Sequence, residues 1–185
     1  MASERVRPSG HERTFGEDEI IVSKTDQRGV ITYANQVFAR IAGYTIPELL
    51  GAPHSIVRHP AMPRCVFKLL WDTIQAGREI FAYVLNMARN GDHYWVLAHV
   101  TPTFDGAGTI IGYHSNRRCP RRAAIARIEP VYTALLAEES RHASKQDAIA
   151  AATRLLTQTL ATARMNYDEF AWSLENAATP VTAGR

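Results

Sequence analysis

Two short apolar runs near the start of the chain predict a β-hairpin. Ile20, Ile21 and Val22 form the first run, and Val30 to Tyr33 form the second. The residues between them, 26–29, read Asp-Gln-Arg-Gly, which is typical of a turn. We therefore expect the first ordered element near residue 18 and two paired strands over about 19–25 and 30–33.

The spacing then changes to that of helices. Asn35 stands where it can cap a short helix that ends at Gly43. Residues 45–48, Thr-Ile-Pro-Glu, resemble a capping box with proline in the first turn. A longer helix is predicted over 63–76, because Val66, Leu70 and Ile74 fall on one face and Gly77 follows.

After residue 79 the pattern becomes that of strands again. We expect strands over 81–88, 92–103 and 109–116, the first two joined by a tight turn at Asn90-Gly91. Five strands in a meander, with the helices inserted between the second and the third, predict an α+β fold. Its five-stranded antiparallel sheet would carry the helices on one face.

The last third of the chain is rich in alanine and predicts two further helices, with a short amphipathic turn over 167–174. Their apolar stripes are Ile125, Ile128, Tyr132, Leu135 and Leu136 in the first helix, and Ile149, Ala152, Leu155, Leu156 and Leu160 in the second. Such stripes need a partner. The sequence leaves open whether they fold back on the sheet or pair with a second copy.

Composition narrows the class of protein. The chain has 185 residues, 46% of them hydrophobic, which suits one compact domain with a helical extension. A net charge of +3 is too small for a nucleic-acid surface. One cluster of arginines could meet an acidic partner, an acidic membrane surface or only water, and we favour the solvated interpretation; it comprises Arg117, Arg118, Arg121, Arg122 and Arg127.

The absence of several motifs from the sequence narrows the class of protein further. The two cysteines, Cys65 and Cys119, lack the spacing of a zinc site or a disulfide scaffold, which fits a reducing cytoplasm. We expect no signal peptide and no membrane span, since no apolar run approaches ~20 residues. No nucleophile elbow, paired-carboxylate motif or phosphate loop is present, so we predict that the chain is not an enzyme.

Several short sequence motifs resemble those of one protein family. They are Thr32 to Asn35, Ala42 to Thr45, Val57 to Pro63, Asn90 to Val96, and Ile111 to Tyr113. Together with the order of elements, they are similar to the PAS domain of bacterial aerotaxis receptors, over roughly residues 18–136. The resemblance implies the PAS fold, non-covalently bound FAD, and a redox state that drives a chemotaxis signalling partner.

The resemblance also implies which residues bind the cofactor. Arg58 offers a planar donor fork suited to phosphate, with His59 beside it. Asn86 would face the flavin ring, and Phe81 would line the pocket. The sequence adds His54 and Trp71 as pocket candidates, with a solvent-facing His54 and a core-packing Trp71 as the alternatives. Phe81 takes the place where the family has a pocket tryptophan, and Ala61 the place of its acidic residue. Trp95 is assigned to packing.

The predicted organisation is a flexible N-terminus (1–16), a PAS sensor domain (17–120), a C-terminal helical extension for signalling and dimerisation (121–176) and a disordered tail (177–185). The expected partners are a chemoreceptor or other signalling protein and a second copy, bound through the C-terminal helices. The signal would pass from Asn86 to the last strand and then to the helix that begins near Ala123.

Two other functions stay open. Seven histidines leave room for haem, with His59, His93, His99 and His114 as candidate axial ligands. A ligand-free PAS domain that mediates dimerisation and docking is the other. A light sensor is disfavoured, because neither cysteine lies in the Asn-Cys-Arg sequence of light-sensing flavin PAS domains.

Overall fold

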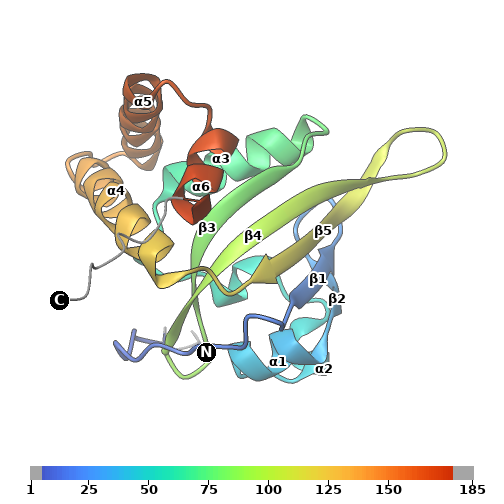
Figure 1. Cartoon of the computed structure of the whole chain (residues 1–185). Helices are drawn as coiled ribbons and strands as arrows, with labels where there is room; N and C mark the ends of the chain where they lie inside the picture. Colours follow the sequence, from blue (N-terminus) through green and yellow to red (C-terminus); the bar gives the residue numbers. More distant parts are fainter. Residues whose placement is uncertain (1–5, 177–185) are drawn as a thin grey trace.

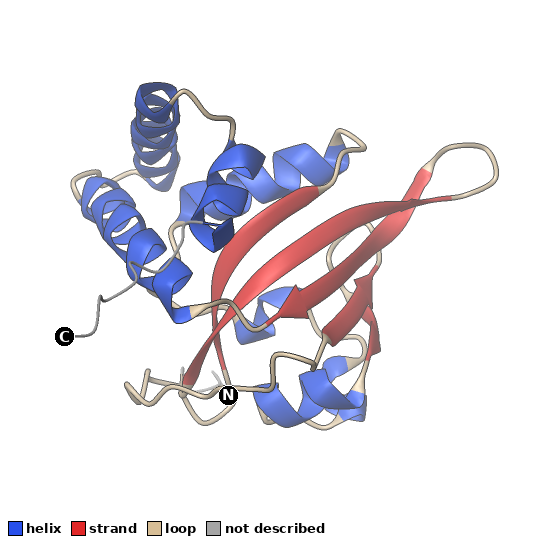
Figure 2. Ribbon diagram, viewed as in Figure 1, coloured by secondary structure: helices blue, strands red, loops and turns tan. Residues whose placement is uncertain are grey.

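The computed structural model describes residues 6–176, and Figures 1 and 2 show its arrangement. The strands are β1 (Ile21–Thr25), β2 (Ile31–Ala34), β3 (Ile80–Met87), β4 (His93–Phe104) and β5 (Ile110–Arg118). The helices are α1 (Gln36–Ala42), α2 (Ile46–Leu49), the 3-10 helix η1 (His54–Val57), α3 (Arg64–Gln75), α4 (Arg122–Ser140), α5 (Lys145–Ala163) and α6 (Tyr167–Asn176).

The strands form one antiparallel sheet in the order β2-β1-β5-β4-β3. This confirms the predicted α+β class and the five-stranded sheet, with strand ends within a few residues of those expected. The predicted simple meander is wrong, because the last strand pairs with the first: β5 lies in the centre, and β2 and β3 form the two edges.

Local sequence explains how the short helices begin and end. The Asn35 side chain accepts a hydrogen bond from the backbone N–H of Phe38, and Gly43 ends α1 with a φ of 71°. Thr45 and Glu48 form the predicted capping box at α2. Gly91 has a φ of 92° in the β3–β4 turn, and a side chain there would collide with the backbone oxygen of Arg7.

One face of the sheet, which we call the inner face, is covered by the helices between β2 and β3. On β3 this face carries Val84 and Asn86, and on β5 it carries Tyr113, Ser115 and Arg117. Helix α3 lies across it, and its Trp71 ring meets Tyr113 edge to face at a centroid distance of 5.5 Å.

The opposite, outer face is covered at the β3 edge by α4 and α6, which gather there in Figure 1. The Tyr132 hydroxyl of α4 donates to the backbone oxygen of Tyr83 at 2.6 Å. The Tyr83 hydroxyl in turn lies 3.0 Å from the Glu175 carboxylate of α6. The C-terminal helices therefore fold back on their own chain, and most of the α4 stripe is buried there, namely Ile125, Ile128, Tyr132 and Leu135.

The segment expected to be a flexible lead-in contacts the β3–β4 hairpin. The Arg13 Nε atom lies 2.9 Å from the Asp92 carboxylate, the backbone N–H of Ser9 donates to the Gly91 oxygen, and Phe15 is buried. Ordered contacts therefore begin about ten residues before the position near residue 18 that the sequence predicts. The predicted disordered tail, 177–185, lies outside the described residues.

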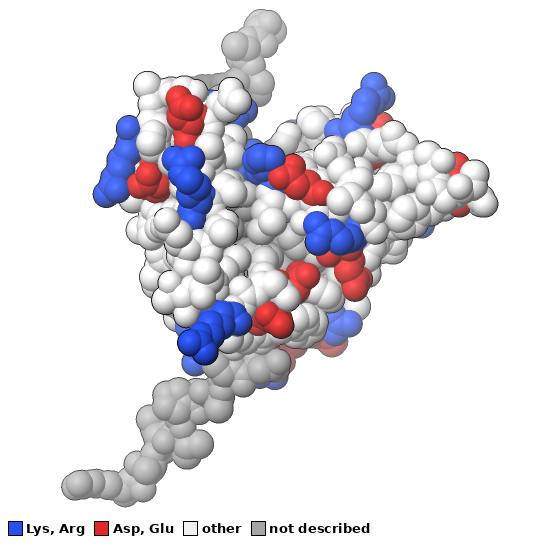
Figure 3. Space-filling view, turned by 90° about the horizontal axis from the view of Figure 1, so that it is seen from above, with Lys and Arg blue, Asp and Glu red and all other residues white. Residues whose placement is uncertain are grey.

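Charge is mixed over one face of the molecule. Figure 3 shows lysine, arginine and acidic side chains interspersed, without a broad patch of one sign on that face. Within residues 6–176, no helix is long and apolar enough to cross a membrane.

Candidate functional site

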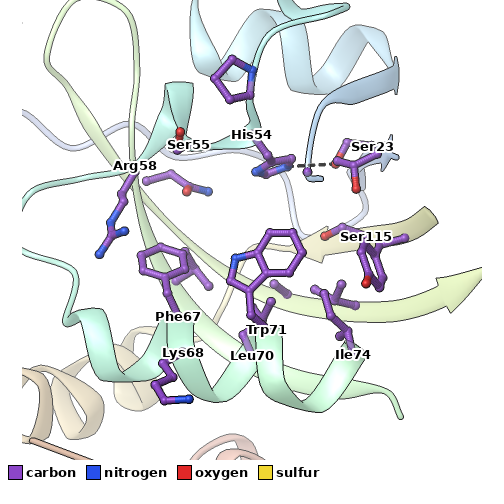
Figure 4. A pocket seen from close by; sticks show the side chains of 18 of the residues that line it. Ser23, His54, Ser55, Arg58, Phe67, Lys68, Leu70, Trp71, Ile74 and Ser115 are labelled. Atoms are coloured by element: carbon purple, nitrogen blue, oxygen red, sulfur yellow. Dashed lines mark hydrogen bonds between the residues drawn. The ribbon is translucent and has the colours of Figure 1, made fainter. Parts of the chain in front are cut away.

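A cavity of about 650 Å³ opens between the inner face of the sheet, η1 and α3. Its volume falls in the range of small-molecule and cofactor sites. Phe67, Leu70, Trp71 and Ile74 of α3 form an apolar wall, and Figure 4 shows the Trp71 ring projecting toward His54. The opposite wall is the sheet, with Val84, Asn86, Ala98, Val100, Tyr113 and Ser115.

A buried cation lies in the cavity wall. Arg117 is only 2% exposed, and its Nη2 atom donates to Ser23 Oγ at 2.6 Å. Its Nε and Nη1 atoms have no hydrogen-bond partner among the described residues, although the guanidinium lies over the Phe38 ring at 4.2 Å. Burial lowers the pKa of Arg117 to about 10, so the side chain remains charged at neutral pH. Leaving two nitrogens of a buried cation without hydrogen bonds is costly for the stability of the fold.

His54 is held neutral beside this cation. Its Nε2 atom lies 3.1 Å from Ser23 Oγ, the contact that Figure 4 marks with a dashed line. Burial, and then the charge of Arg117, lower the pKa of His54 to about 3. Arg117, Ser23 and His54 therefore form one chain of polar contacts with a single positive charge.

Asn86 faces the same cavity from β3. It is 4% exposed and lines the cavity, and no side-chain hydrogen bond joins its amide to a described residue. The amide atoms are not among the fully buried unpaired atoms, which belong to Tyr94 and Arg117, so they reach the cavity. A buried amide normally has a partner, so its donor and acceptor atoms are available to a ligand.

Five further cations line the cavity, of which Arg28 and Lys68 are paired with Asp26 and Asp72, whereas Arg58, Arg64 and Lys145 are not paired. None of these last three is within 4 Å of a carboxylate of residues 6–176. The Arg58 guanidinium lies over the Phe67 ring at 4.2 Å, and burial, then the charge of Arg64, lower its pKa. Unpaired cations that share one opening suit an anionic group such as phosphate.

Four of the six residues predicted to bind a cofactor meet at this cavity: His54, Arg58, Trp71 and Asn86. Phe81 does not. Side chains alternate along β3, so Phe81 lies on the outer face, stacked on His99 at a centroid distance of 4.1 Å and next to Trp172. The inner-face residue at the start of β3 is Ile80, one position earlier.

His59 also lies away from the cavity. It is buried, its Nδ1 atom accepts a hydrogen bond from the backbone N–H of Ala61, and its ring meets that of His93 edge to face. Of the four histidines considered as haem ligands, His59, His93, His99 and His114, none lines the cavity.

Sequence reasoning missed Arg117, Ser23 and the α5 residues Lys145 and Ile149, all of which line the cavity. Arg117 was interpreted as part of a solvated cluster, and this was wrong because the side chain is buried. The signal was present in the alternation of β5, where Tyr113, Ser115 and Arg117 share the inner face.

The residues present fit a flat, partly apolar ligand with an anionic part. Trp71, Phe67 and the sheet would enclose a planar ring, while the Asn86 amide would bond its polar edge. The cations at the mouth would meet a phosphate group.

Comparison with known proteins gives the same fold. Residues 31–117 match the family described as the PAS fold. The aerotaxis receptor of Escherichia coli K12 is 43% identical over 121 residues, which is 65% of this chain and 24% of that protein. A nitrogen fixation regulatory protein of Klebsiella pneumoniae is 30% identical over 99 residues, 54% of this chain and 20% of that protein. The chain thus aligns with a quarter or less of the length of these relatives.

Similarity to solved structures supports the same fold. The blue-light photoreceptor Aureochrome1 LOV in its dark state has a TM-score of 0.51 at 25% identity, covering 55% of this chain and 76% of that one. A light-oxygen-voltage domain studied with a flavin analogue has a TM-score of 0.53 at 20% identity, covering 60% and 84%, and shows the fold alone. This chain therefore contains a PAS domain, and the domain is similar to that of the bacterial aerotaxis receptor.

Proposed function

We propose that the chain is a redox or energy-state sensor that binds FAD in the PAS cavity and signals to a chemotaxis-type partner. One observation carries the proposal: a cavity of about 650 Å³ combines an apolar, aromatic wall with the Asn86 amide and the unpaired cations Arg58, Arg64 and Lys145. A planar ring would fill the apolar part and bond the amide, and a phosphate group would pair with the cations.

FAD suits both ends of the cavity. Its ring would lie between Trp71 and the sheet, with Asn86 at the ring edge, and Arg58 and Arg64 would hold the pyrophosphate. When bound, a flavin supplies reversible acceptance of electrons. The similarity to an aerotaxis receptor supports this choice of ligand.

The protein side of the signal would start at the unpaired polar atoms. A change in the charge or hydrogen-bond donors of the ligand would alter the preferred orientation of the Asn86 amide. It would also alter the electrostatic interaction between the ligand and the charge of Arg117. Arg117 stands near the end of β5, five residues before the start of α4. Strain on β5 would therefore reach α4, and a chemoreceptor or other signalling protein would bind the changed surface.

The surroundings of the sensor are also part of the proposal. The free thiols of Cys65 and Cys119 suit a reducing compartment, and we place the domain in the cytoplasm. A homodimer would need a surface other than the α4 stripe, because Ile125, Ile128 and Leu135 are buried within one chain.

The test is an absorption spectrum of the purified chain, followed by titration of the flavin-free protein with FAD. We expect bound flavin in the wild type and at least a tenfold weaker affinity in Asn86→Ala, because a buried hydrogen bond to the ligand is lost. Asn116→Ala is the control, since Asn116 is exposed and lies on the other side of the central strand β5.

Three results would contradict the proposal. A haem spectrum would replace the flavin with another cofactor. A protein that binds neither would indicate a docking module. Equal affinities of Asn86→Ala and Asn116→Ala for FAD would remove Asn86 from the site.

A further inference from the structure

Helix α5 is a wall of the cavity, although it lies outside residues 31–117 that match the PAS fold. Lys145, its first residue, and Ile149, one turn later, both line the cavity. The helix packs against α3 and α4, as Figure 1 shows. The site is therefore built from the PAS domain together with a segment that comes almost thirty residues after its last strand.

A specific contact holds the start of α5 at this place. Helix α3 begins after Pro63, which supplies no side-chain cap. Instead, the backbone N–H of Cys65 donates to Glu139 Oε1, in the last turn of α4, at 2.9 Å. Glu139 precedes Lys145 by six residues, so this bond fixes the α4–α5 connection at the N-terminus of α3, beside Arg64.

The rest of α5 packs along α4 and α3 largely through small side chains. Its fully buried residues are Ala148, Ala151, Ala152 and Leu156, and alanine buries only one methyl group. Alanine has one side-chain carbon and leucine four, so three alanines bury less apolar surface than two leucines. Four threonine hydroxyls, those of Thr153, Thr157, Thr159 and Thr162, bond back to the carbonyl four residues earlier, a pattern that slightly destabilises helices.

Lys145 also lacks a partner of opposite charge. It is exposed, and no carboxylate of residues 6–176 lies within 4 Å of its ammonium group. Arg58 and Arg64 share the same mouth and are equally unpaired. Three cations that line one cavity repel one another until an anion joins them.

We propose that α5 is part of the ligand site: Lys145 binds the anionic phosphate group of the ligand, Ile149 closes the cavity beside it, and occupancy decides how firmly α5 stays docked. The inference rests on the proposed function for the identity of the ligand. It adds a second output route, in which the ligand is bound directly by a C-terminal helix rather than acting on that helix through β5.

The experiment compares FAD with riboflavin, which has the same ring but no phosphate, on the full chain. We expect Lys145→Gln to weaken FAD about tenfold, the usual size of one charge-assisted hydrogen bond, and to leave riboflavin unchanged. Lys24→Gln is the matched control, because Lys24 is exposed on β1 and does not line the cavity. Hydrogen exchange in α5 should slow when FAD binds to the wild type, and less so in Lys145→Gln.

The outcomes separate the two proposals. The proposed role of α5 is wrong if Lys145→Gln binds FAD as tightly as the wild type does. It is also wrong if FAD leaves the hydrogen-exchange rate of α5 unchanged. In both cases the proposed sensor function stands. An equal loss of FAD and riboflavin in Lys145→Gln would also overturn the phosphate contact. A wild type that binds neither flavin overturns the proposed function and this inference with it.

Discussion

The two faces of the sheet treat polar groups in opposite ways. On the outer face, the Tyr132 hydroxyl donates to the Tyr83 oxygen at 2.6 Å, and the Tyr83 hydroxyl bonds to Glu175 at 3.0 Å. On the inner face, two nitrogens of Arg117 and the amide of Asn86 have no partner among the described residues. The buried polar groups named on the outer face have hydrogen-bond partners and lie under packed helices. Those named on the inner face lack partners and lie beside a cavity.

The contrast separates stability from binding. Satisfied, well-packed groups stabilise a fold, so the outer face and its C-terminal helices hold the sheet together. Unsatisfied buried groups reduce stability and persist where a ligand needs them. Substitutions on the two faces should therefore change the free energy of unfolding in opposite directions.

The largest effect is expected on the outer face. Tyr132 is 3% exposed, and Tyr132→Ala should lower the free energy of unfolding by about 3–5 kcal/mol, as for other buried aromatic residues. Tyr132→Phe, which removes only the hydroxyl, should cost about 1 kcal/mol. Chemical denaturation measures both. A loss in Tyr132→Ala no larger than that in Tyr132→Phe would show that α4 does not hold the sheet.

The second effect depends on pH. The pKa of His54 is about 3 in the folded state and about 6.5 when unfolded, so between these values only the unfolded chain takes up the proton. Stability should fall as pH falls from 6.5, by at most about 1.4 kcal/mol per pH unit, and level off above 6.5.

Denaturation of the ligand-free protein between pH 4.5 and 6.5 tests this, because carboxylates titrate mainly at lower pH. In His54→Gln the free energy of unfolding should depend less steeply on pH, by the slope that corresponds to about one proton taken up on unfolding. The remaining slope would come from His59, whose pKa burial also lowers. His99→Gln is the control, since His99 lies away from the cavity. An equal slope in His54→Gln and the wild type would mean that His54 is charged in the folded protein.

The smallest effect has the opposite sign. Arg117→Met replaces an unpaired buried charge by an apolar chain of similar length, and we expect the ligand-free protein to gain about 1 kcal/mol while FAD binding weakens. Arg118→Met, on the exposed neighbour, should change neither. If Arg117→Met destabilised the ligand-free fold, the cation would be structural and the inner face would resemble the outer one.

The sequence predicted the elements better than it predicted the site. The cap at Asn35, the capping box at Thr45 and the turn at Gly91 were all found, because each depends on residues close together in the chain. The cavity residues Ser23, Arg117 and Lys145 come from β1, β5 and α5, and no local pattern relates them. Phe81 was placed in the cavity although it differs from Asn86 by an odd number of positions in one strand, and regular alternation separates them.

The sequence by itself determined the order of the strands and helices, the turns that join them and the resemblance to aerotaxis receptors, since these follow from periodicity and short motifs. Only the tertiary structure decided that Arg117 is buried without a counter-ion, that α4 and α6 cover the outer face, and that α5 reaches the cavity. Alternation along β5 could place Arg117 on the inner face, but whether its charge finds a counter-ion, and which helices cover each face, depends on contacts between residues far apart in the chain.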